Sequence, residues 1–284
     1  MTGEPRMNTQ PSIPRPEYPR PDFVRKDWMN LNGTWQFAED FGQSGRARGM
    51  QKADAPDALF VQIIVVPFCR ESVLSGLGHR DFCECVWYRR SFEIPDAWTG
   101  KTVLLHIGAC DYETEVYVNG RSVGVHRGGF ASFSFDITAF LAVGRNILTL
   151  CVEDHLRSDN QASGKQCREY ASRGCSYTRT TGIWQTVWLE CVPKSYIRRI
   201  RVFPNLAEQS VAIECTVRGE GRLTAAATYA GKPEGTAEAQ VGLPLPESAE
   251  DTVTKELRYL QHPASDRAVV LQMKLCDLRL WEIG

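Results

Sequence analysis

The sequence predicts an all-β protein whose short strands build sandwiches or barrels. Short apolar or alternating runs bounded by turn residues recur along the chain, as in Val86–Glu93 and Thr102–Ile107, and such runs are typical of strands. The pair Asn119-Gly120 separates two of these runs and is the strongest short-range signal of a β-hairpin, because both residues tolerate positive φ. No segment carries the long amphipathic pattern of a helix, so a fold of many short strands is favoured.

The expected strands fall into two series. The first series is Leu59–Val66, Val86–Glu93, Thr102–Ile107, Thr114–Val118, Ser122–Val125, Phe130–Phe135, Asn146–Val152 and Ile183–Glu190. The second is Ile197–Phe203, Val211–Val217, Leu223–Tyr229, Thr252–Tyr259 and Ala268–Leu275, with the Gly-, Ala-, Pro- and Glu-rich stretch Gly231–Pro246 as a connection. In Ile183–Glu190, aliphatic residues alternate with two tryptophans, as expected for a strand inside a two-sheet sandwich.

The 284 residues are enough for two domains, since domains usually span ~100–200 residues. Residues 1–22 are rich in proline and are expected to form an extended N-terminal extension. We place the first domain at residues 23–193 and the second at residues 194–284, because a Pro-Lys pair separates the two series of strands. The polar stretch Glu153–Ser176 has no strand period. Such a long connection is usually functional or disordered, and we interpret this one as functional.

Composition excludes several classes of partner. Lys and Arg number 33 against 34 Asp and Glu, so the chain lacks the basic surface that nucleic acid requires. The longest apolar run is far short of the ~18 residues of a membrane helix, and the N-terminus has no apolar stretch typical of a secretory signal. The ten cysteines form no CxxC pair. We interpret them as reduced thiols and place the protein in the cytoplasm.

The chain shows no constellation of catalytic or metal-binding residues. Its five histidines follow no zinc-site spacing, and both the Gly-x-Ser-x-Gly and the dinucleotide-binding glycine motifs are absent. Glu71, Glu113 and Glu115 stand out only by residue type, and for each the interpretation as a surface or loop-anchoring carboxylate is favoured. We therefore expect no catalytic residue, no metal ligand and no cofactor in this chain.

Several motifs, in order along the first series of strands, carry a resemblance to glycoside hydrolase family 2. They are Leu31-Asn32-Gly33-Thr34-Trp35-Gln36-Phe37, Val66-Pro67-Phe68-Cys69, Val86-Trp87-Tyr88-Arg89-Arg90-Ser91-Phe92, Val116-Tyr117-Val118-Asn119-Gly120, His126-Arg127-Gly128-Gly129-Phe130, Phe135-Asp136-Ile137-Thr138 and Tyr177-Thr178-Arg179-Thr180-Thr181-Gly182-Ile183-Trp184-Gln185. The resemblance implies a galactose-binding-like jelly roll, which is the family's sugar-binding domain. Residues 195 onward resemble the family's immunoglobulin-like β-sandwich. Because the chain ends within a motif around Leu280-Trp281, we expect this second sandwich to be incomplete at its C-terminus.

The family includes β-galactosidases, β-glucuronidases and β-mannosidases, whose catalytic glutamates come from a third domain, a (β/α)8 barrel. The resemblance therefore implies the non-catalytic N-terminal portion of an enzyme that hydrolyses β-glycosidic bonds. In this interpretation the chain supports the barrel and walls the substrate pocket, is inactive alone, and meets its carbohydrate substrate through the barrel. The resemblance leaves open whether the chain forms a homo-oligomer. The alternative is a stand-alone carbohydrate-binding or interaction module, since fold does not imply function.

The resemblance also indicates Ser176, Tyr177 and Arg179 as substrate-binding residues. Ser176 stands where galactosidases and glucuronidases carry an Asp that touches the sugar, and Cys69 stands where galactosidases carry an Asn. Both departures weaken the case for assigning to this chain the galactose or glucuronate specificity of those enzymes. Arg179 offers a fixed fork of donors for sugar hydroxyls or a carboxylate. Its alternative role is an ion pair with the barrel or with Glu190.

Overall fold

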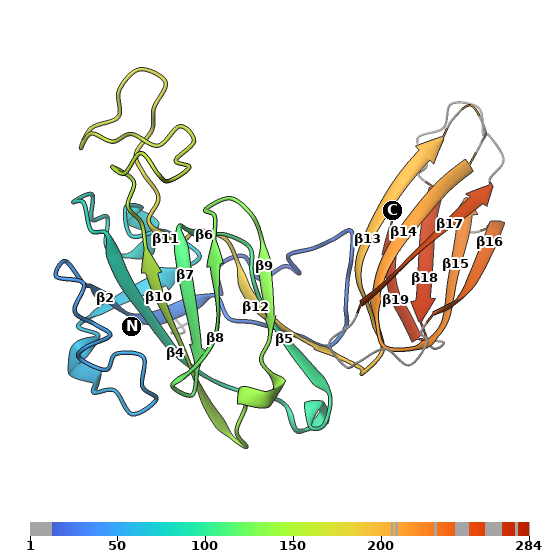
Figure 1. The fold of residues 1–284 in the computed structure, drawn as a ribbon, viewed down its shortest axis with the longest axis horizontal. Coiled ribbons are helices and arrows are strands. Elements are labelled where there is room, and N and C mark those ends of the chain that lie inside the picture. Colours follow the sequence, from blue (N-terminus) through green and yellow to red (C-terminus); the bar gives the residue numbers. More distant parts are fainter. Residues whose placement is uncertain are drawn as a thin grey trace, which may run out of the picture. The chain divides into compact units, whose positions relative to one another are not determined.

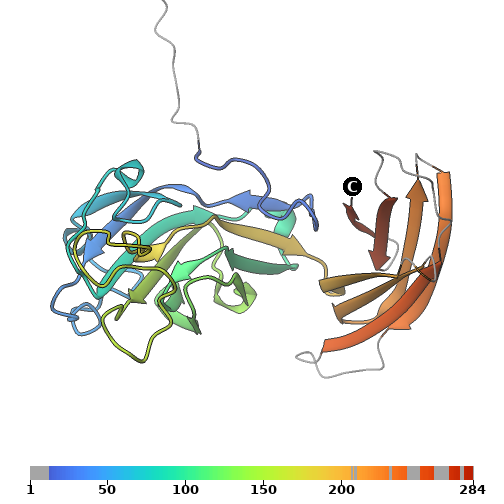
Figure 2. The same cartoon turned by 90° about the horizontal axis from the view of Figure 1, so that it is seen from above.

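The computed structural model describes residues 13–205, 207, 210–229, 232–241, 250–258, 269–275 and 278–283, which are mostly strand (Figure 1, and from another side in Figure 2). They divide into two compact units. The first contains residues 13–17 and 29–190, and the second contains Tyr18–Trp28 together with the residues from Cys191 onward. The division after Glu190 differs by three residues from the expected boundary.

The first unit is a sandwich of two main antiparallel sheets. The six-stranded sheet has the order β3 (Gln62–Val66), β2 (Gly33–Glu39), β4 (Cys85–Glu93), β10 (Arg145–Glu153), β7 (Glu113–Val118) and β8 (Arg121–Arg127). The four-stranded sheet has the order β1 (Trp28–Asn30), β12 (Val187–Val192), β5 (Thr102–Ile107) and β9 (Phe133–Asp136). A small sheet pairs β11 (Gly182–Ile183) with β6 (Cys110–Asp111), and 3-10 turns lie at η1 (Asp57–Leu59), η2 (Val73–Ser75), η3 (Asp96–Trp98) and η4 (Thr138–Phe140).

Strand β4 is buried on both faces, which explains its long run of apolar and aromatic residues. One face carries Tyr88, whose ring centroid lies 4.9 Å from that of Phe37 and whose hydroxyl accepts a hydrogen bond from the backbone N–H of Ile183. The other face carries Trp87, which lies in a buried cluster with Met50 and Phe60 from the connection between β2 and β3. A strand that is covered on both faces cannot show a simple in-and-out alternation.

The Asn119-Gly120 hairpin is confirmed, because it joins β7 to β8 with φ of 51° and 78° at its two central residues. Two expected strands begin later than the sequence indicates. Leu59 closes the 3-10 turn η1, so β3 begins only at Gln62. Likewise, β9 begins at Phe133 rather than at Phe130.

The expectation of one continuous strand over Ile183–Glu190 is wrong. Ile183 ends β11 and Val187 begins β12, and these strands belong to different sheets. The backbone N–H groups of Trp184 and Gln185 both reach the carbonyl oxygen of Ala109, at N–O distances of 3.2 and 3.4 Å. The chain therefore crosses between sheets here, although the alternation of side chains continues through the crossing.

The second unit is also a sandwich of two antiparallel sheets. One sheet has the order β13 (Tyr196–Asn205), β14 (Ser210–Arg218) and β17 (Glu250–Arg258). The other has the order β16 (Lys232–Val241), β15 (Gly221–Tyr229), β18 (Val269–Leu275) and β19 (Leu278–Ile283). The core of the unit includes Ile197, Ile213 and Leu223, and it also includes Phe23, which we had assigned to the first domain.

The expectation that Gly231–Pro246 is a connection is wrong, because it contains strand β16. This strand lies at the edge of its sheet, where a proline such as Pro233 is tolerated. The pairing register shifts opposite Pro233 and Gly235, and from there half-buried residues such as Ala237 alternate with exposed ones. The half-buried positions of this strand carry small side chains, so the sequence shows no alternation of large apolar residues here.

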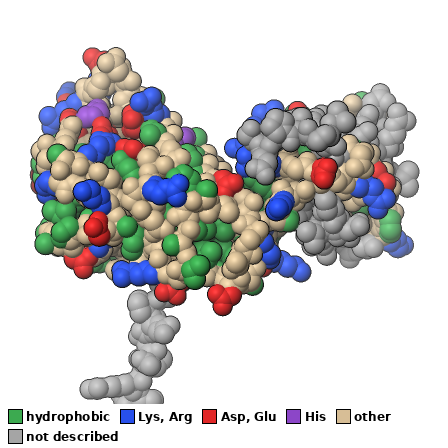
Figure 3. Space-filling view, turned by 60° about the horizontal axis from the view of Figure 1, so that its bottom comes forward, with side chains coloured by type: hydrophobic (Ala, Val, Ile, Leu, Met, Phe, Trp, Pro, Cys, Tyr) green, Lys and Arg blue, Asp and Glu red, His purple; other side chains and the backbone are tan. Residues whose placement is uncertain are grey.

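The surface carries charges of both signs. On the face shown in Figure 3, Lys and Arg side chains are interspersed with Asp and Glu over the first unit. Within the described residues, no helix is long and apolar enough to cross a bilayer.

Gly182 provides a test of how tightly the first sandwich is packed. Gly182 and Gly144 have similar positive φ angles, 83° and 78°. A Cβ atom at Gly182 would lie 2.1 Å from the Tyr88 hydroxyl, whereas a Cβ atom at Gly144 would meet nothing within 4 Å. Gly182→Ala should therefore lower the free energy of unfolding by about 1–3 kcal/mol more than Gly144→Ala, because only the first change overpacks the core. Urea denaturation of both variants measures this difference, and equal losses would contradict it.

Candidate functional site

A long loop, residues 154–181, connects β10 to β11 and projects beyond the end of the sheets (yellow-green in Figure 1). It contains no strand. Two isolated β-bridges lie within it, between Gln166 and Tyr177 and between Arg173 and Ser176. Its buried apolar side chains are Leu156 and Cys167. The expectation of an irregular connection is therefore confirmed, and with so little apolar area the loop depends on polar contacts for its position.

Gln166 ties the loop to the sandwich. Its Nε2 donates to Asp111 Oδ2 at 2.5 Å, and its Oε1 accepts from the backbone N–H of Thr180 at 2.7 Å. One side chain thus joins β6 to the last residues of the loop. Gln166 is not recognisable from the sequence, because a glutamine in a polar stretch carries no signal that would distinguish it.

Thr181 anchors the end of the loop on two buried carboxylates. Its backbone N–H donates to Glu71 Oε2 at 3.1 Å, and its hydroxyl donates to Asp154 Oδ2 at 2.9 Å. Burial raises the pKa of both carboxyl groups. Glu71 also contacts the guanidinium of fully buried Arg70, which pairs with Glu39 as well. The sequence interpretation of Glu71 as a loop anchor is confirmed.

Asp111 is a third buried acid beneath the loop. Burial, and then the nearby charges of Asp154 and Glu71, raise its pKa to about 7, while the hydrogen bond from Gln166 opposes that rise. The backbone of Gly129 packs directly against this carboxyl group, since a Cβ atom there would lie 2.3 Å from Asp111 Cγ. The loop therefore rests on a carboxyl group whose charge changes near neutral pH.

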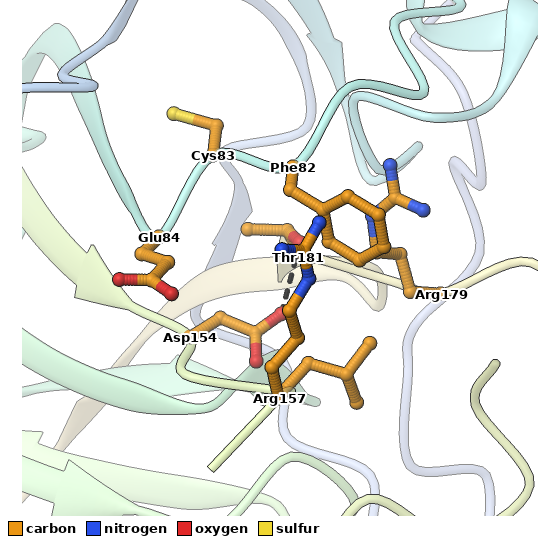
Figure 4. Close-up of a pocket in the computed structure, with 8 residues that line it drawn as sticks. Phe82, Cys83, Glu84, Asp154, Arg157, Arg179 and Thr181 are labelled. Atoms are coloured by element: carbon orange, nitrogen blue, oxygen red, sulfur yellow. Dashed lines mark hydrogen bonds between the residues drawn. The ribbon is translucent and has the colours of Figure 1, made fainter. Parts of the chain in front are cut away.

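Arg179 lies in a small pocket at the base of the loop. The pocket is lined by Phe82, Cys83, Glu84, Asp154, Leu156, Arg157, Arg179 and Thr181 (Figure 4). Arg179 is only 3% exposed, and its Nε and Nη2 have no hydrogen-bond acceptor among the residues that the structure describes. Its guanidinium carbon lies 3.9 Å from the centroid of the Phe82 ring, and that of Arg157 lies 3.7 Å from it. Desolvation lowers the pKa of Arg179.

The structure separates the three predicted substrate-binding residues. Arg179 lines the pocket, whereas Ser176 and Tyr177 do not. Ser176 is half-buried in a turn with Arg173, and Tyr177 is 63% exposed. The suggested ion pair between Arg179 and Glu190 is not formed. Glu190 instead lies 3.0 Å from His106 Nε2, and its Oε1 accepts a hydrogen bond from the indole of Trp188.

This arrangement can bind an acceptor but offers little else chemically. A buried guanidinium with two free donors can hold a carboxylate or a pair of hydroxyl oxygens in a fixed orientation. The carboxylates of Glu71 and Asp154, which interact electrostatically with Arg179, already accept hydrogen bonds from Thr181. The pocket therefore has the features of a recognition element.

Residues 77–193 match the family model for the glycosyl hydrolases family 2, sugar binding domain. The β-galactosidase of Thermoanaerobacter pseudethanolicus is 30% identical over 139 residues, and the β-glucuronidase of Paenibacillus borealis is 31% identical over 137 residues. These alignments cover 47% and 48% of this chain but only 18% and 22% of the two relatives. The chain thus spans about a fifth of the length of these curated relatives.

Solved structures share the fold over almost the whole chain. The β-glucuronidase from Ruminococcus gnavus in complex with D-glucaro-d-lactam has a TM-score of 0.70 at 18% identity, covering 92% of this chain and 45% of that chain. The β-glucuronidase of Bacteroides uniformis has a TM-score of 0.66 at 21% identity, covering 91% of this chain and 32% of that chain. At such identities the likeness establishes the fold, and the expectation of an all-β protein of sandwich domains is confirmed.

Replacement by methionine should lower the stability of the chain at Arg70 but not at Arg179. Arg70→Met leaves Glu39 and Glu71 without their buried cation, and such a loss costs about 3–5 kcal/mol of stability. Arg179→Met removes buried donors that lack acceptors, so the free energy of unfolding should stay unchanged or rise by up to about 2 kcal/mol. Chemical denaturation of both variants tests this. A loss for Arg179→Met as large as that for Arg70→Met would contradict it.

The contribution of Asp111 to stability should fall as pH rises from about 4 to 7. An unfolded Asp has a pKa of ~3.9, so in this window folded Asp111, with its pKa of about 7, keeps a proton that the unfolded chain has released. Its contribution is complete below pH ~4 and is lost as pH rises through 7, with a slope of at most ~1.4 kcal/mol per pH unit. Asp154 and Glu71, whose pKa values are also raised, act in the same direction.

Unfolding measured at several pH values between 4 and 7 should show that the free energy of unfolding falls more, or rises less, with pH in the unmodified chain than in Asp111→Asn. The exposed Asp54 supplies a matched control, because Asp54→Asn changes the same chemical group outside the site. Identical slopes for Asp111→Asn and Asp54→Asn would show that Asp111 does not titrate in this range.

Proposed function

We propose that this chain is the non-catalytic N-terminal portion of a β-glycosidase, because residues 77–193 match the family model for the glycosyl hydrolases family 2, sugar binding domain. In this proposal the first sandwich supports a catalytic domain and the base of the long loop forms part of the substrate pocket wall. The substrate is a β-galactoside or a β-glucuronide, in line with the named activities of the relatives.

The observation that carries the proposal is that Nε and Nη2 of Arg179 have no acceptor within the described part of the chain. A buried donor without an acceptor costs about 1–3 kcal/mol, so its presence in the pocket favours an acceptor that lies outside the described residues. Sugar hydroxyls, the carboxylate of a uronic acid and a carboxylate of the catalytic domain all have the required oxygen atoms. We propose that a substrate oxygen is the acceptor.

The surroundings of Arg179 support a role in positioning. The Phe82 ring packs on its guanidinium, and the adjacent Thr181 is held by Glu71 and Asp154. A side chain fixed in this way loses little conformational entropy when it binds, which makes its hydrogen bonds more effective. The guanidinium would therefore orient the sugar without taking part in bond cleavage.

Hydrolysis with retention needs two carboxyl groups ~5 Å apart that are free to act as acid/base and nucleophile. Glu71 and Asp154 accept hydrogen bonds from Thr181, and Asp111 accepts one from Gln166. We therefore assign the catalytic carboxylates to a separate domain, and we propose that this chain alone has no turnover.

In the full-length parent enzyme, Arg179→Ala should lower kcat/KM about 10- to 150-fold. Losing one charged hydrogen bond to substrate costs ~1.5–3 kcal/mol, and each 1.4 kcal/mol corresponds to about tenfold. The matched control is Arg173→Ala, which removes an exposed arginine from the same loop. Kinetics with aryl β-galactoside and aryl β-glucuronide measure both variants. Unchanged kcat/KM for Arg179→Ala, or an equal loss for Arg173→Ala, would refute the role of Arg179.

The isolated chain should hydrolyse none of the aryl β-galactoside, β-glucuronide or β-mannoside substrates. Turnover that co-purifies with the chain, and is absent from a mock preparation, would contradict the assignment of catalysis to another domain. Saturable binding of a free sugar by the isolated chain, lost in Arg179→Ala, would instead favour the alternative of a stand-alone carbohydrate-binding module.

A further inference from the structure

A second cluster of reactive side chains lies on the face of the six-stranded sheet that carries Trp87. It consists of Cys85 on β4 and Cys151 and Glu153 on β10. The strand register pairs Cys85 with Glu153 and Trp87 with Cys151, so the two cysteines are diagonal neighbours on one face. Their Sγ atoms are 3.8 Å apart, and a Glu153 carboxylate oxygen lies within 4.8 Å of both.

The separation of the two sulfur atoms suits a shared metal ion. Zn²⁺ in a tetrahedral site has Zn–S distances of ~2.3 Å, which place two thiolate sulfurs ~3.8 Å apart. A disulfide fits less well, because diagonal residues in antiparallel strands have Cα atoms ~7–8 Å apart, whereas disulfides usually join Cα atoms ~4.4–6.8 Å apart. We propose that Cys85, Cys151 and Glu153 form a binding site for Zn²⁺ or a similar tetrahedral thiophilic cation, with water as the fourth ligand.

The two thiols are buried, whereas the carboxylate reaches the surface. Cys85 and Cys151 are 2% and 1% exposed and pack with Trp87 and Met50, while the Glu153 side chain is 24% exposed. Both thiols must lose their protons to bind a metal, so the affinity should fall as pH is lowered.

Arg46 supplies to Glu153 the positive charge that a bound metal ion would supply. Its guanidinium contacts Glu153 Oε1 and lies 3.0 Å from Glu115 Oε2. The Arg46 side chain is 47% exposed, so it can leave Glu153 while keeping Glu115. Asp40 is a less suitable ligand, since its Oδ2, 3.9 Å from Cys85 Sγ, already accepts from Gly45 N and Trp87 Nε1. Arg46 and the metal should therefore compete for Glu153.

The test is titration of the whole chain with Cd²⁺, and then Zn²⁺, in the presence of a phosphine reductant. Cadmium reports its thiolate ligands directly through a ligand-to-metal charge-transfer band in the ultraviolet. We expect one equivalent bound with two thiolates, and the thiolate band of that site lost in Cys85→Ala and in Cys151→Ala. Glu153→Gln should weaken binding about tenfold or more, as the loss of even an outer-sphere group commonly does.

Two cysteine variants that should bind normally, and one variant that should bind more tightly, distinguish loss of the site from misfolding. Cys110→Ala removes another buried thiol and Cys175→Ala removes an exposed one, and both variants should bind like the unmodified chain. Arg46→Gln should bind cadmium more tightly, because it removes the competing cation from Glu153. A folded chain that takes up no cadmium, uptake that is lost only in Cys175→Ala, or weaker binding by Arg46→Gln would overturn the proposal.

Discussion

The candidate site depends on one constraint, which is that each buried carboxyl group needs a hydrogen-bond donor. Glu71 and Asp111 lie under the long loop and Asp154 begins it, and the loop supplies donors to all three, from Thr181 and Gln166. Because the loop buries few apolar side chains, these directional bonds do the work that packing does elsewhere in the sandwich. At the end of the same loop, Nε and Nη2 of Arg179 have no acceptor among the residues that the structure describes.

Local sequence signals predicted most of the first sandwich. The Asn119-Gly120 turn and the runs that became β4, β5 and β10 were recognisable because their periods and turn residues agree with the final structure. The failures occurred where tertiary structure overrides a local pattern. Alternation persists through Trp184 and Gln185 although the chain changes sheets there, and β16 uses small residues at an edge, where large apolar ones are not required.

The site was predicted only in part, and for a physical reason. Arg179 could be found because its motif is contiguous in sequence. Gln166 could not, because its importance comes from reaching Asp111, which is 55 residues away. The same holds for Cys85 and Cys151, whose spacing of 66 residues matches no metal motif. Strand register, which depends on the whole sheet, brings such residues together, and a single sequence does not reveal it.

Phe23 in the core of the second unit makes that unit discontinuous in sequence, because Tyr18–Trp28 and the residues from Cys191 onward build it together. During synthesis, the first segment leaves the ribosome long before its partners exist. The first sandwich, whose strands are nearly contiguous, can form in the meantime. A cut at residue 190 or 191, which looks natural from the strand order, would remove an aromatic side chain from a core that needs it. Dissection of the chain into separately expressed domains therefore has to carry the early segment along with the late one.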